Sequence, residues 1–254
     1  HLLQRFKVTQ YMKAIGFIPL RKGSKGIPGK NKRKMVGRPL FTWVLGEAIF
    51  SNLDEVIVYT DDEAVIDFIE KEYHWTSKVK PVLRSEESAS DTASTEYAML
   101  EYCESINYDF DSFCLLQATS PFTRRQDINT CLEKLNGNYD SALTVVNTHR
   151  FLWDNEGNAL NYEPTDRPRR QDFDGLLIEN GAVYSTTKDS LKSTKNRLGS
   201  KVAVVQMSEE SLHEIDSETD WTVVEQLLIE RQKREKTSKK ITHFVLDVDG
   251  VFTD

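Results

Sequence analysis

A short apolar run is followed at once by a glycine-rich, basic loop over residues 15–31. The run from Ile15 to Leu20 predicts a buried strand. The loop after it holds three glycines and several lysine and arginine side chains. A glycine-rich turn lets backbone N–H groups approach an anionic ligand closely, and basic side chains neutralise phosphate charge. The segment therefore indicates a nucleoside triphosphate site at the end of a strand.

The spacing of this loop excludes two common phosphate-binding patterns. It matches neither G-x-x-x-x-G-K-[ST], the loop of many NTPases, nor G-x-G-x-x-G, the dinucleotide fingerprint. Glycine and lysine are common in loops of every kind, so a mobile basic surface loop is the structural alternative.

Composition places the chain among ordinary globular proteins. It has 254 residues, 39% hydrophobic residues and a net charge of −7, which gives no reason to expect nucleic acid as a partner. Its three cysteines are too few and too scattered for a disulfide framework or a zinc site. No apolar stretch approaches the length of a membrane span, and no secretory signal is present. We therefore expect no membrane partner and a cytoplasmic location.

Strand and helix patterns alternate along most of the chain, which predicts a parallel sheet flanked by helices. Residues 147–180 interrupt this alternation with a polar excursion before a further strand at residues 181–184. A helix is predicted over residues 63–72 and another over 92–105.

Two polar segments stand beside predicted strands. Residues 84–95 lead into the first turn of the helix at 92–105, and Asp91 or Thr92 is the expected cap of that helix. Residues 117–120 (Gln-Ala-Thr-Ser) follow a buried strand, where open α/β sheets bind ligands. Plain helix capping and a turn before Pro121 are the structural alternatives.

Three arginines, Arg167, Arg169 and Arg170, stand within four residues of the excursion. Such a cluster suits a carboxylate ligand, because guanidinium groups bind carboxylates with two hydrogen bonds. A solvated basic patch or a nuclear localisation signal is the alternative.

Glu214 and Asp216 are two residues apart in a segment predicted to be extended, so their carboxylates point to the same side. Paired carboxylates can hold a hard cation such as Mg²⁺. A solvated acidic turn is the alternative.

The loop pattern Arg21-x-x-Ser24-Lys25-Gly26-x-x-x-Lys30-Asn31 resembles the signature loop of the CMP-sialic acid synthetases, or acylneuraminate cytidylyltransferases. The resemblance continues in Leu-Gln-Ala-Thr-Ser-Pro (116–121) and in Arg-Arg-Gln-Asp-Phe-Asp-Gly followed by Glu-Asn-Gly (169–181), and it covers roughly residues 13–235. It implies an α/β fold with a doubly wound, mostly parallel sheet like those of nucleotide-sugar transferases. It also implies a homodimer, with the excursion at 147–184 packed on the second subunit.

The resemblance assigns the nucleotide site. Arg21, Lys30 and Asn31 are expected to act in catalysis at the phosphates. The expected nucleotide-binding set adds residues around the phosphates, cytosine and ribose: Arg21, Ser24, Lys25, Gly26, Lys30, Asn31, Arg84, Ala93, Ser94 and Thr95.

The resemblance also assigns the second substrate and the cofactor. The residues expected at the sugar acid are Gln117, Thr119, Ser120, Arg170, Gln171 and Tyr184. Asp216 and Glu214 are expected to bind Mg²⁺, with Glu214 in place of the family's usual aspartate.

The two ends of the chain fit no part of this pattern. We expect Met12 to be the native start and residues 1–11 to be a leader introduced for expression. The cytidylyltransferase domain is expected over residues 12–236. Residues 237–254 read as a linker and the first strand of a haloacid dehalogenase-type phosphatase domain, because Asp247-x-Asp249-Gly-x-x-Thr253 resembles that family's first motif.

The predicted reaction joins CTP to a nine-carbon nonulosonic acid, N-acetylneuraminate or its deaminated analogue KDN, and releases pyrophosphate. A cytidylyltransferase for a legionaminate-type acid or for the eight-carbon acid KDO is an alternative. A nucleotide-binding scaffold without activity is another. The cytoplasmic location becomes a nuclear one if the chain is of the animal type.

Overall fold

The computed structural model describes residues 12–24 and 26–237 of the chain. Both terminal segments singled out from the sequence, 1–11 and 238–254, lie outside the described residues, and so does Lys25. The strands are β1 Ala14–Leu20, β2 Lys34–Met35, β3 Arg38–Pro39, β4 Glu55–Thr60, β5 Val79–Leu83, β6 Ser112–Leu116, β7 Ser141–Thr148, β8 Leu176–Thr187 and β9 Val202–Gln206. The α-helices are α1 Phe41–Ile49, α2 Glu63–Glu72, α3 Glu86–Ala89, α4 Thr95–Ser105, α5 Arg125–Leu135, α6 Lys188–Thr194 and α7 Glu218–Thr237.

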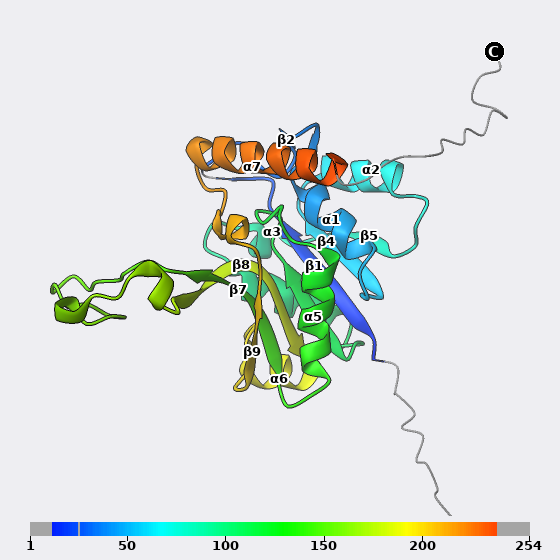
Figure 1. The fold of residues 1–254 in the computed structure, drawn as a ribbon. Coiled ribbons are helices and arrows are strands. Elements are labelled where there is room, and N and C mark those ends of the chain that lie inside the picture. Colours follow the sequence, from blue (N-terminus) through cyan, green and yellow to red (C-terminus); the bar gives the residue numbers. More distant parts are fainter. Residues whose placement is uncertain (1–11, 25, 238–254) are drawn as a thin grey trace, which may run out of the picture.

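Seven of these strands form one twisted sheet in the order β5-β4-β1-β6-β8-β7-β9 (Figure 1). Strand β8 runs antiparallel to both of its neighbours, and the other pairs are parallel. The central strand β1 is buried along nearly its whole length, because helices cover both faces of the sheet. The predicted doubly wound, mostly parallel sheet is confirmed.

The side chains of β1 alternate between two hydrophobic cores. Ile15 and Phe17 face one core, which α4 and α6 close. Ala14 and Ile18 face the other, which α1, α2 and α5 close. Because successive strand residues point to opposite faces, one apolar run anchors both layers of helices.

Helix α7 packs on a third, smaller cluster over the loop that follows β1. Val224 and Leu228 of this helix belong to the same buried cluster as Ile27 of the loop, Trp43 of α1 and Ile215. The loop after β1 is therefore held between the sheet and the C-terminal helix.

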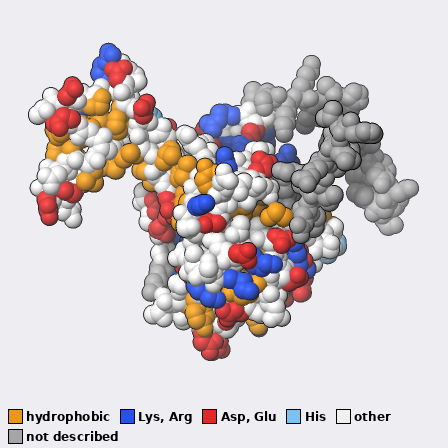
Figure 2. Space-filling model, turned by 90° about the horizontal axis from the view of Figure 1, so that it is seen from below, with side chains coloured by type: hydrophobic (Ala, Val, Ile, Leu, Met, Phe, Trp, Pro, Cys, Tyr) orange, Lys and Arg blue, Asp and Glu red, His pale blue; other side chains and the backbone are white. Residues whose placement is uncertain are grey.

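An arm, residues 149–175, leaves the sheet between β7 and β8 and projects to one side (Figure 1). It contains two short 3₁₀ turns, Pro164–Asp166 and Arg170–Asp172, and a single bridge between Trp153 and Ala159. Apolar side chains gather along it in the space-filling view (Figure 2). The structure thus places the predicted excursion outside the core, and β8 begins at Leu176, earlier than the strand predicted at 181.

The start of α4 corrects one sequence expectation. The helix begins at Thr95, and the Ser94 hydroxyl accepts a hydrogen bond from the Tyr97 N–H at 3.0 Å. The predicted caps, Asp91 and Thr92, lie in the preceding turn.

Two further findings concern the described residues. Cys103, Cys114 and Cys131 are buried and form no disulfide. No helix within residues 12–24 and 26–237 has the length and apolarity needed to cross a membrane.

Candidate active site

The fold brings two loops together at one edge of the sheet. Strand β1 has β4 on one side and β6 on the other, so the order in which the strands follow one another along the sheet reverses beside β1. Ligands of open α/β sheets bind outside the carboxyl ends of the strands at such a reversal. The basic loop follows β1 there, and Gln117 follows β6.

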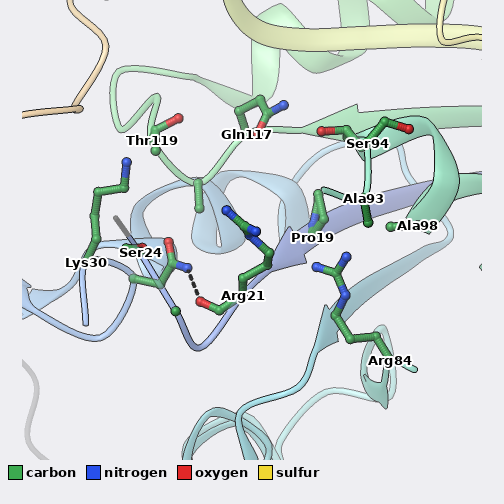
Figure 3. Close-up of a pocket in the computed structure, with 14 residues that line it drawn as sticks. Pro19, Arg21, Ser24, Lys30, Arg84, Ala93, Ser94, Ala98, Gln117 and Thr119 are labelled. Atoms are coloured by element: carbon green, nitrogen blue, oxygen red, sulfur yellow. Dashed lines mark hydrogen bonds between the residues drawn. The ribbon is translucent and has the colours of Figure 1, made fainter. Parts of the chain in front are cut away.

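A cavity opens between these loops and the start of α4 (Figure 3). Ten of its lining residues were expected at the substrates from the sequence: Arg21, Ser24, Lys30, Asn31, Arg84, Ala93, Ser94, Thr95, Gln117 and Thr119. Residues separated by almost one hundred positions in the sequence therefore share one concave site.

The lining of this cavity is strongly positive. Arg21, Lys30 and Arg84 contribute three cationic side chains, and no aspartate or glutamate stands among the described residues that line it. The whole chain carries a net charge of −7. Basic groups are thus concentrated where the protein as a whole is acidic, which favours a polyanionic ligand.

Arg84 forms the floor of the cavity and is 7% exposed. Its side chain donates to the Ser88 hydroxyl at 3.1 Å and to the Ser88 backbone oxygen. Burial lowers the pKa of its guanidinium, and the nearby Asp61 carboxylate partly offsets this effect. The Arg84 guanidinium is thus held in one position by Ser88, and the Asp61 carboxylate offsets its positive charge only in part.

Arg21 and Asn31 hold the two ends of the basic loop together. The Asn31 amide donates to the Arg21 backbone oxygen at 3.2 Å, the bond drawn in Figure 3. The Arg21 guanidinium donates to the backbone oxygen of Ser90 at 3.0 Å and pairs with Asp91 at 3.2 Å. Arg21 therefore connects the loop to the segment that leads into α4.

The first turn of α4 faces the cavity with Ser94, Thr95 and, one turn later, Ala98. The N–H groups at a helix start carry partial positive charge, which adds to the field of the arginines. The side chain of Ala98 is small, so a ring can approach the helix closely.

Lys30 links the loop to the predicted metal-binding segment. Its ammonium donates to the Ile215 backbone oxygen at 2.6 Å and lies 3.5 Å from the Asp216 carboxylate. Gly26 packs so tightly on this segment that an added Cβ would lie 2.1 Å from the Asp216 backbone oxygen. Two independent contacts thus fix the distance between the loop and residues 214–216.

Glu214 and Asp216 flank Ile215, which is fully buried, and both are exposed. Partial desolvation of its carboxyl group, together with the neighbouring carboxylates of Asp216 and Glu179, raises the pKa of Glu214. Within the described part of the chain, no three His, Cys, Asp or Glu side chains are grouped as a metal site. The arrangement therefore offers two oxygen donors and not a complete protein cage.

Besides the arm residues and the carboxylate pair, three of the predicted residues that the structure describes do not line this cavity: Gly26, Ser120 and Tyr184. Gly26 faces Asp216, as described. Ser120 is buried, and its backbone oxygen accepts a hydrogen bond from Thr123. Tyr184 is buried in β8, where its hydroxyl donates to Glu179.

Arg170 and Gln171 line a different cavity at the base of the arm, beside His149 of the arm and the end of β9. The predicted arginine cluster is also divided. Arg167 stacks on Phe151 at 4.5 Å, and Arg169 pairs with Asp172 at 2.6 Å. Within one subunit the structure therefore separates Arg170 and Gln171 from the residues around Lys30.

Four lining residues were missed from the sequence: Pro19, Gly23, Ala98 and Ala118. Ala98 was accessible to prediction, because it lies four residues after Ser94 on the same helix face. Gly23 and Ala118 adjoin predicted residues, and small apolar residues carry little signal of their own.

Comparison with known proteins supplies the family. A family model described as cytidylyltransferase matches residues 15–241. N-acylneuraminate cytidylyltransferase B of Danio rerio is 36% identical over 217 residues, which cover 82% of this chain and 50% of that protein. The CMP-N,N'-diacetyllegionaminic acid synthase of Legionella pneumophila is 28% identical over 235 residues, covering 85% of this chain and 97% of that protein. The chain spans about half the length of the Danio rerio relative.

Solved structures agree with the fold. CMP:2-keto-3-deoxy-manno-octonic acid synthetase complexed with CTP has a TM-score of 0.61 at 20% identity, over 86% of this chain and 99% of that one. The 4-diphosphocytidyl-2C-methyl-D-erythritol synthase of Anaerococcus prevotii has a TM-score of 0.63 at 14% identity, over 86% and 96%. The similarity to N-acylneuraminate cytidylyltransferases confirms the resemblance seen in the loop motif. The chain belongs to the cytidylyltransferase family.

Proposed function

We propose that the chain transfers CMP from CTP to the anomeric hydroxyl of a nonulosonic acid, N-acetylneuraminate or KDN, and releases pyrophosphate. The observation that carries this proposal is the cavity with three cationic side chains and no described carboxylate. Relatives named N-acylneuraminate cytidylyltransferase support the choice of substrates.

In this reaction the anomeric hydroxyl oxygen attacks the α-phosphorus in line. One P–O bond forms, the P–O bond to the β-phosphate breaks, and the hydroxyl proton is lost. Arg21 and Lys30 stabilise the negative charge that develops on the α-phosphate and on the departing pyrophosphate, and Asn31 orients the α-phosphate. Catalysis comes mostly from positioning and charge neutralisation.

The base and the ribose occupy the part of the cavity next to α4. Arg84, Ala93, Ser94 and Thr95 line that part. Gln117 and Thr119 lie across from Arg21 (Figure 3) and are the residues we assign to the sugar acid within the same subunit.

Glu214 and Asp216 are the proposed Mg²⁺ ligands. Mg²⁺ is usually held by one or two carboxylates plus substrate phosphates, so a two-carboxylate donor set beside a phosphate loop fits this ion. When bound, Mg²⁺ would neutralise charge on the triphosphate. We expect Asp216→Asn to raise the Mg²⁺ concentration needed for half-maximal turnover. Near-normal turnover of this variant at low Mg²⁺ would show that the assignment is wrong.

We further propose that the protein is a homodimer held by the arm. Trp153, Leu160 and Leu177 are each about half exposed or more, at 51, 62 and 49%. Trp153 and Leu160 lie on the arm, Leu177 lies in β8 just after it, and apolar side chains gather along the arm (Figure 2). Exposed apolar side chains that gather in this way mark interaction surfaces. In such a dimer, Arg170 and Gln171 act in the partner's site, because within their own subunit they line a separate cavity.

A complementation assay tests the shared site. Lys30→Ala and Arg170→Ala each remove one substrate contact, from the cavity and from the arm. If the arm acts in the partner's site, mixed dimers of the two inactive variants regain one intact site, and activity reappears on mixing. A mixture that stays as inactive as either variant alone contradicts the shared site.

The test of the activity is Mg²⁺-dependent pyrophosphate release from CTP. N-acetylneuraminate, KDN, a legionaminate-type acid and KDO are supplied in parallel. We expect release with a nine-carbon acid, and the ratio of kcat/KM values then ranks the acids. A preference for KDO would instead indicate a cytidylyltransferase for this eight-carbon acid. No release with any acid while CTP still binds would support the inactive scaffold.

A further inference from the structure

A second cavity lies on the far side of the loop that follows β6. It opens between α1, that loop, β3 and α7, and the residues that matter here are Arg38, Trp43, Glu47, Arg124, Arg231 and Glu235. None of its lining residues lines the CTP cavity. Motif analysis of the sequence assigned no role to these residues.

Arg231 is the buried anchor of this cavity. It is 8% exposed, and it donates to the Phe122 backbone oxygen at 3.1 Å. Its Nε lies 3.4 Å from Glu235, and Arg124 pairs with the same glutamate. The Glu235 carboxylate thus pairs with two guanidinium groups, those of Arg231 and Arg124.

Arg38 supplies a third guanidinium at the mouth of the cavity. Its guanidinium stacks on the Trp43 indole at 3.6 Å, and the described part of the chain offers that side chain no hydrogen bond or ion pair. The other acidic group present, Glu47, accepts the backbone N–H of Arg125 at 2.8 Å. The residues that line the cavity therefore include three arginines and two glutamates, and one of these arginines is already fixed by its hydrogen bond to Phe122.

Guanidinium groups recognise phosphate and carboxylate oxygens with paired, charge-assisted hydrogen bonds, and they do so best where water is partly excluded. The cavity has a volume of about 170 Å³. Since a water molecule takes up about 30 Å³, this is room for about five waters, or for one phosphate group with part of its hydration.

We propose that this cavity is a second anion site that binds a phosphate group, separate from the site for CTP. Arg38 and Arg124 contact the anion, and Arg231 supports them from below. The ligand is either a free phosphate or pyrophosphate, or the phosphate of a nucleotide.

The position of the cavity gives a bound anion a route to the CTP site. Residues 117–119 of the loop after β6 line the CTP cavity, whereas Pro121, Thr123 and Arg124 line the second one. Arg231 is bonded to the backbone of the same loop at Phe122. An anion that binds Arg124 therefore contacts the same loop that places Gln117 in the CTP cavity.

The test titrates inorganic phosphate, pyrophosphate and CMP separately into full-length Lys30→Ala protein, in which the CTP site is weakened. Tryptophan emission and calorimetric heat are followed together. We expect saturable binding of at least one anion with a change in tryptophan emission, because the bound anion shifts the Arg38 guanidinium that stacks on the Trp43 indole. Trp43→Phe should remove that emission change and keep the heat. The anion that binds most tightly identifies the source of the phosphate.

Matched variants decide between the two cavities. Arg38→Gln and Arg124→Gln should each weaken binding by about tenfold or more, the cost of a charge-assisted contact. Arg125→Gln should bind as the parent does, because its side chain does not line the cavity and its backbone N–H still holds Glu47. Equal binding by Arg38→Gln, Arg124→Gln and Arg125→Gln, or no saturable binding of any anion, would overturn the proposal.

Discussion

Replacing Gly26 by alanine tests whether the distance between the basic loop and residues 214–216 controls catalysis. The added Cβ would lie 2.1 Å from the Asp216 backbone oxygen and 3.2 Å from the carbonyl carbon. Carbon and oxygen atoms do not pack at such a distance, so the two segments must separate by about 1 Å. The φ of Gly26 lies outside the left-handed region, so alanine adds no backbone strain, and the contact alone is changed.

The expected cost follows from that displacement. A misplacement of about 1 Å between groups that act on one substrate lowers the rate about 100-fold, which corresponds to about 2.7 kcal/mol of barrier. Gly26 is exposed, so we expect the free energy of unfolding to change by less than about 1 kcal/mol. The loss should therefore appear in kcat/KM for CTP and not in the unfolding curve.

Gly46→Ala is the matched control. Gly46 lies in α1, outside the cavity, and no atom stands within 4 Å of the Cβ that alanine would add. The assay compares pyrophosphate release by Gly26→Ala, Gly46→Ala and the parent, each with a urea unfolding curve. If Gly26→Ala stays within about threefold of Gly46→Ala, catalysis does not depend on the distance between the loop and residues 214–216, and the reasoning fails.

Three further predictions concern stability. Ser94→Ala removes the cap of α4 and should cost about 1 kcal/mol, or a Tm lower by about 2–4 °C, whereas Ser94→Gly should cost a few tenths; equal melting of both variants would contradict the cap. Burial opposes ionisation of Glu96, but its hydrogen bond from Arg197 outweighs this and lowers the pKa of the carboxyl below 4.5. The stabilisation by the ionised Glu96–Arg197 pair is present above about pH 4.5 and is lost as the pH falls through the lowered pKa that Glu96 has in the folded protein. Glu96→Gln should therefore flatten the decline of the urea midpoint between about pH 5 and pH 3. Phe17→Ala should cost roughly 3–5 kcal/mol, because this fully buried ring contacts three other aromatic rings; a loss below about 1 kcal/mol in urea unfolding would contradict its place in the core.

Local signals in the sequence predicted much of the fold. Helix α2 has the predicted bounds, Glu63–Glu72, because Asp62 is a strong cap signal before an amphipathic pattern, and in the structure its side chain accepts from the Ala64 N–H. The apolar run of β1 predicted a buried strand, since both faces of the central strand are covered. Most residues that line the cavity between the basic loop and α4 were also singled out from the sequence, because several of them follow strand ends.

Features that depend on distant contacts were not predictable. Asp91, Thr92 and Ser94 are all good caps, and the choice of Ser94 follows from where the chain docks on the sheet, with Arg21 holding the segment before it at Ser90. The sequence places Arg170 beside other arginines, whereas its position on the arm decides which cavity it reaches. Arginines as far apart in sequence as Arg38 and Arg231 cannot be recognised as one cluster before the fold is known.

The central claim is that the cavity between the basic loop and α4 binds CTP. Calorimetric titration of CTP into the parent, Lys30→Met and Lys22→Met tests it most directly, because Lys30 lines the cavity and the exposed Lys22 of the same loop does not. The account predicts that Lys30→Met binds CTP at least about tenfold more weakly than the parent and that Lys22→Met binds nearly as the parent does. Equal affinity of the two variants, or no binding of CTP by the parent, would contradict it.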